Sequence, residues 1–187
     1  MAARSTRNSH ESKSEILKAA LEVVRRSGAQ SLTMDAVAEE SGFSKGGVLY
    51  NFPTKDALIT GMVEFLAGQF EAEVAAARER NLSSECPTLS AMIEVTEGWL
   101  SEQRDLAQAM LATKADRPDL SEPFMGVKSR MKAAIEAELS DRGKAWAIWA
   151  CLEGLHFSEA HCVTIFTDEE RALVFQDLRK RLTQLQD

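Results

Sequence analysis

Apolar residues recur every three or four positions along most of this chain of 187 residues, a spacing that places them on one face of an α-helix. The first such segment covers residues 12–27. Two short helices are expected next, over residues 33–42 and 45–52. A long fourth helix should begin after Pro53, which cannot continue the third, and run toward Arg80.

Residues that favour helix ends support these boundaries. Thr33, Ser44 and Thr54 each precede one of the helices, where a side-chain hydroxyl can accept a hydrogen bond from the first turn. Ser12 and Thr167 are each followed three residues later by a glutamate, which is the pattern of a capping box. The inward faces of the third and fourth helices are expected to be Val48, Leu49 and Phe52, and Leu58, Met62, Phe65, Leu66 and Phe70.

Five more helices are expected after a loop at residues 81–87, over residues 88–101, 104–115, 122–139, 144–163 and 168–185. No segment shows the alternation of a β-strand. The sequence therefore predicts an all-α fold of about nine helices, in which an N-terminal three-helix head with a helix-turn-helix is joined by the long fourth helix to a C-terminal helical bundle. The domains predicted are a flexible arm (1–11), a head with the helix-turn-helix (12–56) and a body (57–187).

Charge is divided unevenly between these parts. Residues 1–60 contain eight Lys and Arg and seven Asp and Glu, a net charge of +1, whereas the remainder contains 14 and 22, a net charge of −8. A head that is slightly basic can contact DNA even though the whole chain carries −7. No apolar run approaches the roughly 20 residues of a membrane span, and no signal peptide precedes the head, so a cytoplasmic protein with reduced cysteines is expected.

The third predicted helix has the composition of a helix that meets DNA. Gly46 and Gly47 inside a helix each cost about 1 kcal/mol relative to alanine, so a close approach by another surface would explain them. Lys45, Tyr50 and Asn51 could contact phosphates and base edges. The alternative is that the threonines and serines only cap helices and that the polar side chains only face solvent.

The segment ILKAAL in the first helix and the segment GAQSLTMDAVAEESGFSKGGVLYNFPTKDALI, from Gly28 to Ile59, resemble the DNA-binding head of the TetR family of transcriptional regulators. This resemblance implies a homodimer that places its third helices in successive major grooves of a palindromic operator, and a small-molecule effector that releases it. Repression is the family's commoner mode. Asn51 departs from the family, which often has histidine there. The DNA-binding residues implied are Thr33, Ser44, Lys45, Gly46, Gly47, Tyr50, Asn51 and Lys55.

The resemblance also implies an effector pocket in the body and a dimer interface in the last two helices. The apolar and aromatic residues expected to line the pocket, unless they are simply core, are Met92, Trp99, Met110, Phe124, Met125, Met131 and Trp149, with His156. Glu97, Gln103, Gln108 and Glu153 are further polar candidates. The expected interface, with an internal core as the alternative, comprises Trp146, Leu155, Phe175, Leu178 and Leu182.

Other classes of function have weaker support in the sequence. Cys151, Glu153, His156, His161 and Cys162 lack the spacing of a metal site, so no metal or cofactor is expected. Cys86, in a loop, is a candidate redox-sensitive thiol because a loop cysteine can be exposed. An enzyme is not expected because phosphate-binding loops, nucleophile elbows and HExxH are missing, and the acidic body argues against a protein that coats DNA.

Overall fold

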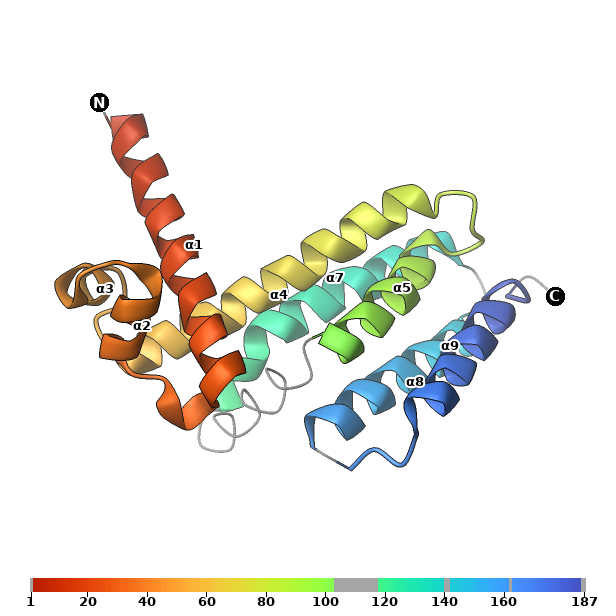
Figure 1. Cartoon of the computed structure of the whole chain (residues 1–187). Helices are drawn as coiled ribbons and strands as arrows, with labels where there is room; N and C mark the ends of the chain where they lie inside the picture. Colours follow the sequence, from red (N-terminus) through yellow and green to blue (C-terminus); the bar gives the residue numbers. More distant parts are fainter. Residues whose placement is uncertain (1, 103–117, 140–141, 162, 186–187) are drawn as a thin grey trace. The chain divides into compact units, whose positions relative to one another are not determined.

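The computed structural model describes residues 2–102, 118–139, 142–161 and 163–185, and these form eight α-helices and no strands (Figure 1). The predicted all-α fold is confirmed, while the helix expected over 104–115 lies outside the described residues. The chain divides into two compact units, Met1–Ala67 with Ala109–Pro123, and Gly68–Gln108 with Phe124–Asp187. The division falls within the long helix α4, so α4 contributes to both units.

The N-terminal unit contains α1 (Ala2–Ser27), the short 3₁₀ helix η1 (Ala29–Ser31), α2 (Met34–Ser41), α3 (Lys45–Asn51) and the first part of α4 (Lys55–Arg80). Helix α1 packs against η1, α2 and α3. The side chains at the centre of this unit are fully buried: Ile16, Ala20, Val37, Val48, Leu58 and Met62. These six apolar groups come from all four α-helices, which explains why the short helices α2 and α3 can be stable here.

Helix α1 begins at Ala2, not at the expected Ser12, so residues 2–11 are helical and are not an arm without regular structure. The buried face from Ile16 to Val24 holds the helix, and the preceding alanines, arginines and glutamate are residues that favour its continuation. Ser12 therefore lies inside the helix and the expected capping box does not mark its start.

The caps of α2, α3 and α4 are confirmed. The side-chain oxygens of Thr33, Ser44 and Thr54 accept hydrogen bonds from the backbone N–H of the residue three positions on, at 3.1, 3.1 and 3.0 Å. Gly42 ends α2 with φ +72°, in the left-handed region that glycine enters without steric cost. These local interactions fix the turn between α2 and α3.

The inward faces of α3 and α4 follow the prediction with one exception in each helix. Val48 and Phe52 are buried, but the side chain of Leu49 is 37% exposed. Seven residues form only two turns, so one more apolar side chain does not fit on the face that meets α1 and α2. In α4, Leu58, Met62, Leu66 and Phe70 are buried, and Phe65 is half-buried at the edge of the stripe.

The C-terminal unit consists of the rest of α4, α5 (Pro87–Glu102), most of α7 (Glu122–Glu138), α8 (Gly143–Ala160) and α9 (Asp168–Leu182); the short 3₁₀ helix η2 (Pro118–Ser121) belongs to the first unit. Helices α5, α8 and α9 pack against one another, and α8 and α9 run in opposite directions (Figure 1). The predicted capping box of α9 is confirmed: Thr167 Oγ1 accepts from Glu170 N–H at 3.2 Å, and the Glu170 carboxylate accepts from Thr167 N–H at 2.9 Å. No helix in the described part of the chain is long and apolar enough to cross a bilayer.

Two charged links join α4 to α7 within this unit. Arg130 donates to both carboxylate oxygens of Glu71, at 2.5 and 2.8 Å. Glu138 accepts from Arg78 Nε at 3.0 Å, and also from the backbone N–H and hydroxyl of Thr88, at 2.9 and 2.7 Å. The Glu138 carboxylate thus satisfies the first turn of α5 as well as tying α7 to α4.

Candidate functional site

The residues implied as DNA contacts gather at α2, α3 and the start of α4. Thr33, Ser44, Lys45, Gly46, Tyr50 and Lys55 are exposed, and Gly47 and Asn51 are half-buried. The side chain of Tyr50 is 85% exposed, which is unusual for an aromatic ring that could pack on its own helix. The structure therefore does not use Tyr50 in its core.

Gly46 and Gly47 are not required by packing within the chain. A Cβ added at Gly46 would lie 4.0 Å from Ser44 Oγ, and one at Gly47 would lie 3.4 Å from Ser44 Oγ and 3.6 Å from Phe43 Cδ1. These are ordinary van der Waals distances, and both residues have helical backbone. Alanine would fit at either position and would favour the helix. Nothing in the described chain accounts for two adjacent glycines on this exposed face.

Lys45 and Asn51 have partners inside the head. Lys45 Nζ lies 2.9 Å from Asp35 Oδ2, which joins the first residue of α3 to the first turn of α2. Asn51 Nδ2 donates to the backbone oxygen of Gly47 at 2.9 Å. This bond uses one of the two N–H groups of the Asn51 amide, and the other N–H and the oxygen stay available for an adenine.

The expected pocket residues of the body occupy different environments. Met92 and Met131 are buried, Trp99, Phe124, Trp149 and His156 are half-buried, and Met125 is 57% exposed. Met110, Gln103 and Gln108 lie outside the described residues. The described candidates thus range from the core of the body to its surface.

Two of these residues, Trp99 and His156, meet across Phe70 of α4. The Phe70 ring lies edge-on to Trp99 and to His156, with ring centroids 5.1 and 6.1 Å apart. His156 Nε2 is 3.3 Å from Thr96 Oγ1, and burial lowers the pKa of His156 to about 4, so the ring is neutral at pH 7. We call Phe70, Trp99 and His156 the aromatic cluster.

Carboxylates accompany the indoles of the body. Trp99 Nε1 donates to Glu73 Oε2 at 2.6 Å, and Trp149 Nε1 donates to Glu153 Oε1 at 3.1 Å. Glu153 also pairs with Lys128 of α7. Glu97, another polar candidate, instead pairs with Arg179 of α9.

Four of the five residues expected at the dimer interface are buried within the chain. Leu155, Phe175, Leu178 and Leu182 belong to the core between α5, α8 and α9, and Trp146 is half-buried. Their 3-4-3 spacing does mark a helix seam, but the partners are helices of the same chain. These four side chains thus take part in the core of the chain itself, and Leu178 also lines the groove described next.

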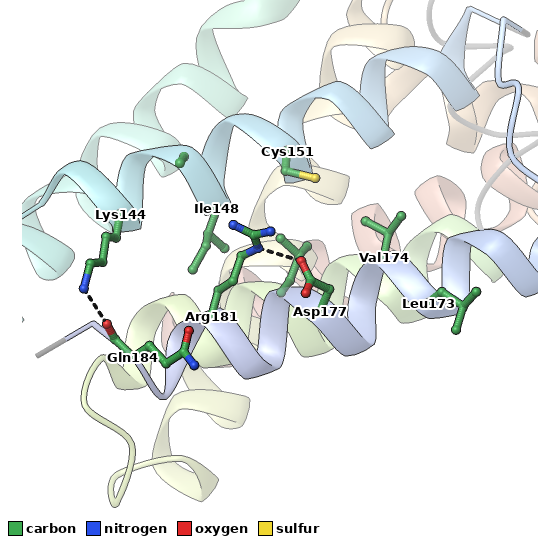
Figure 2. A pocket seen from close by; sticks show the side chains of 10 residues that line it. Lys144, Ile148, Cys151, Leu173, Val174, Asp177, Arg181 and Gln184 are labelled. Carbon is green, nitrogen blue, oxygen red and sulfur yellow. Dashed lines mark hydrogen bonds and ion pairs between the residues drawn. The ribbon is translucent and has the colours of Figure 1, made fainter. Parts of the chain in front are cut away.

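The outward face of α8 and α9 carries a groove of about 680 Å³ that sequence reasoning missed (Figure 2). Two cations line it: Lys144 donates to the Gln184 backbone oxygen, and Arg181 pairs with Asp177 (Figure 2). The signal that could have revealed it is the row of small residues along α8. The groove is lined by Lys144, Ala147, Ile148, Cys151, Leu173, Val174, Asp177, Leu178, Arg181 and Gln184.

The structure also bears on the candidate thiol Cys86 and on the candidate metal ligands. Cys86 is fully buried, contrary to the expectation of an exposed loop thiol, because its Sγ donates to Glu138 Oε2 at 3.2 Å under the start of α5. Burial raises the pKa of Cys86 to about 12. Among the residues that the structure describes, no three His, Cys, Asp or Glu side chains are placed to hold a metal ion; Cys162 lies outside them.

Solved structures that resemble this chain share its fold. The multidrug binding protein EbrR complexed with malachite green is 23% identical, with a TM-score of 0.65 over 91% of this chain and 97% of that one. A TetR transcription regulator from Haloarcula marismortui is 17% identical, with a TM-score of 0.70 over 94% and 98%. A TetR-family member from Streptomyces coelicolor is 24% identical, with a TM-score of 0.66 over 92% and 98%. At these identities the likeness establishes the fold.

Family models give the more direct evidence. No curated protein matches the chain. The model of bacterial regulatory proteins of the tetR family matches residues 16–62, which hold most of the helix-turn-helix head. The model of the tetracyclin repressor-like C-terminal domain matches residues 87–183, which is more than half of the chain. With both parts matched in the expected order, the chain belongs to the TetR family of transcriptional regulators.

Proposed function

We propose that this protein is a ligand-responsive repressor that binds a palindromic operator as a homodimer through α3 and is released by a small-molecule effector. The observation that carries the DNA-binding part is the pair Gly46–Gly47. Both glycines lower helix stability, both have room for a Cβ, and they lie between Lys45 and Tyr50, whose side chains are exposed. A groove wall of DNA pressed against α3 would explain why side chains are excluded there.

The contact chemistry of the head fits this role. Lys45 and Lys55 can bind phosphates, and the Tyr50 hydroxyl can bind a phosphate or a base edge. The caps Thr33 and Ser44 place backbone N–H groups of two helix N-termini on the same exposed part of the head. Because the head has a net charge of about +1, we expect this binding to depend on these contacts rather than on a broad basic surface.

A matched set of α3 variants tests the DNA-binding proposal. Gly46→Ala should stabilise the folded protein by about 0.5–1 kcal/mol and yet weaken binding to operator DNA, because it adds a methyl group to the contact face. Tyr50→Ala and Gly47→Glu should abolish the gel shift while the far-UV circular dichroism is unchanged. Leu82→Ala, an exposed apolar residue after α4, is the control. Normal operator binding by all three α3 variants would rule out α3 as the reading helix.

The groove on α8 and α9 supports the dimer. It is mainly apolar, and its lining residue Leu173 is 63% exposed; Phe157 of α8 is 59% exposed. Exposed apolar area of this kind is a common feature of protein interfaces. A second copy related by a two-fold axis would cover the same face on both chains, and it would present two α3 helices to two half-sites.

Oligomeric state tests this part independently of DNA. Leu173→Glu should give a monomer in sedimentation analysis, since an unpaired charge would be buried at the contact. Met125→Glu introduces the same charge at a similarly exposed leucine-sized side chain on α7 and should leave the dimer intact. A dimer that persists in Leu173→Glu would contradict the proposed interface.

The aromatic cluster and the carboxylates near the indoles support an effector that is aromatic and cationic. EbrR, whose fold this chain shares, is described as a multidrug binding protein and was solved with malachite green and with proflavin. Aromatic rings provide flat walls, and Glu73 and Glu153 provide negative charge beside Trp99 and Trp149. The effector would favour a conformation of the dimer whose heads no longer match the operator.

Malachite green and proflavin are direct probes of this proposal. Each should raise the melting temperature and release the protein from operator DNA, and Trp99→Ala should weaken both effects. Leu82→Ala removes an exposed apolar side chain outside both the aromatic cluster and the groove and serves as the control. Absence of binding by both dyes would contradict the proposed effector class, and binding without release from DNA would contradict the regulatory coupling.

A further inference from the structure

The ion pair between Asp35 and Lys45 lies on the exposed surface of the head. Lys45 Nζ is 2.9 Å from Asp35 Oδ2, and the two side chains are 57% and 71% exposed. Asp35 belongs to the first turn of α2, and Lys45 is the first residue of α3. The pair therefore spans the two helix N-termini that Thr33 and Ser44 cap.

The Asp35 carboxylate occupies a position that would suit a phosphate of DNA. A helix N-terminus favours an anion, and an ammonium group beside it adds a charged donor. In this structure the anion is supplied by the chain itself. The Lys45 ammonium has three N–H donors, but the Asp35 carboxylate would repel a phosphate brought to the same group, so one contact should weaken when the other forms.

We propose that Asp35 competes with DNA phosphate for Lys45 and so limits the affinity of the head for DNA of any sequence. This inference rests on the proposed DNA-binding function. Asp35 is a tuning residue that acts through Lys45 and contacts no base. Its effect belongs to the electrostatic part of binding, which is independent of sequence and depends on salt.

The size of the effect follows from the exposure of the pair. Exposed ion pairs are weak, so the need to break this one on binding should lower the DNA affinity of the wild type only about 2- to 5-fold per head. The pair therefore does not prevent binding. Removing the carboxylate also adds one net positive charge to a head that carries about +1, so the fall of affinity with salt should become steeper.

A double-mutant cycle with full-length protein tests the competition. The probes are a labelled duplex of arbitrary sequence and the operator, titrated at several salt concentrations. Asp35→Asn should bind both duplexes about 2- to 5-fold more tightly per head, with a steeper salt dependence. In the Lys45→Gln background Asp35→Asn should leave the DNA affinity almost unchanged, because there is no longer a lysine ammonium that the carboxylate could hold.

Glu40→Gln is the matched control. Glu40 lies on the same helix and pairs with Arg26 of α1 at 2.8 Å, so this variant removes the same charge from a similar interhelical pair that involves no implied DNA contact. Its DNA affinity should change less than that of Asp35→Asn. Thermal unfolding of each variant verifies that the head remains folded.

Three results would overturn the inference. An equal gain from Asp35→Asn with and without Lys45 would show that Asp35 acts by general repulsion of DNA. An equal gain from Glu40→Gln would show that only net charge matters. Unchanged or weaker binding by folded Asp35→Asn would show that no competition exists. Wild-type protein that binds no DNA would instead refute the proposed function, and this inference with it.

Discussion

Two glycines of α4 have different surroundings, and this difference gives a quantitative test of how the N-terminal unit packs. A Cβ at Gly61 would lie 2.8 Å from Phe52 Cε1 and 3.3 Å from Leu17 Cδ2. Phe52 and Leu17 are both buried, so neither can move away without disturbing the core. A Cβ at Gly68 would have no neighbour within 4 Å, and this glycine is exposed.

The same substitution should therefore have opposite effects at the two positions. Replacing a helical glycine with alanine stabilises a helix by roughly 0.5–1 kcal/mol, and Gly68→Ala should show this gain. Gly61→Ala has the same gain in helix propensity, but its methyl group forces Phe52 out of place, and overpacking of a core costs about 1–3 kcal/mol. The propensity term cancels between the two variants, so their free energies of unfolding should differ by about 1–3 kcal/mol.

Urea unfolding followed by far-UV circular dichroism measures this difference, provided that both variants give the same m-value. Gly68→Ala should unfold at a higher urea concentration than the wild type, and Gly61→Ala at a lower one. If Gly61→Ala were as stable as Gly68→Ala, the close approach of α4 to Phe52 would be incorrect, and with it the packing that positions α3.

Three further predictions concern polar groups that are buried or half-buried in the C-terminal unit. The pKa of His156 is about 4 in the folded protein and about 6.5 in the unfolded chain, so the unfolded state takes up a proton first as the pH falls. About 3 kcal/mol of the free energy of unfolding should therefore be lost between pH 6.5 and pH 4. In urea titrations His156→Phe should lose less stability over this pH range, and an equal loss would contradict the burial of a neutral ring. Glu138→Gln should lower the free energy of unfolding by about 1–3 kcal/mol, because Thr88 and Arg78 lose a charged acceptor; an unchanged urea midpoint would refute the network. Cys86, with a pKa of about 12, should react with iodoacetamide only on unfolding, and labelling of Cys86 in the native protein, detected by mass spectrometry, would contradict its burial.

Local signals in the sequence were sufficient for most helix ends. The caps Thr33, Ser44, Thr54 and Thr167 act on backbone groups three residues away, so the information lies within one turn of helix. The predicted start of α1 at Ser12 was wrong, because no strong stop signal precedes Ser12 and helix-favouring residues extend the helix back to Ala2.

Which side chains pair with one another across the fold could not be predicted from the sequence. The apolar spacing of Phe175, Leu178 and Leu182 shows that one face of α9 is covered, but it does not show whether the cover comes from the same chain or from another. The ion pair of Asp35 with Lys45 bridges ten residues, and the hydrogen bond of Thr88 to Glu138 bridges fifty. Such pairings depend on how helices cross, which periodicity does not specify.

The implied DNA contacts could be predicted from the sequence only in part. Their exposure could be predicted because Val48 and Phe52 fix the buried side of α3 and leave Lys45 and Tyr50 outside. The hydrogen bond from Asn51 to Gly47 could not, because a side chain that ends a helix can face either solvent or its own backbone.

The central claim is that α3 reads a symmetric DNA site, and selection of bound fragments from a random duplex library tests it most directly. Wild-type protein should enrich a two-fold symmetric sequence whose half-sites are centred about one helical turn of DNA, or a multiple of it, apart. Folded Gly47→Glu protein should enrich no sequence. Failure of the wild type to enrich any sequence beyond the Gly47→Glu control would contradict the account.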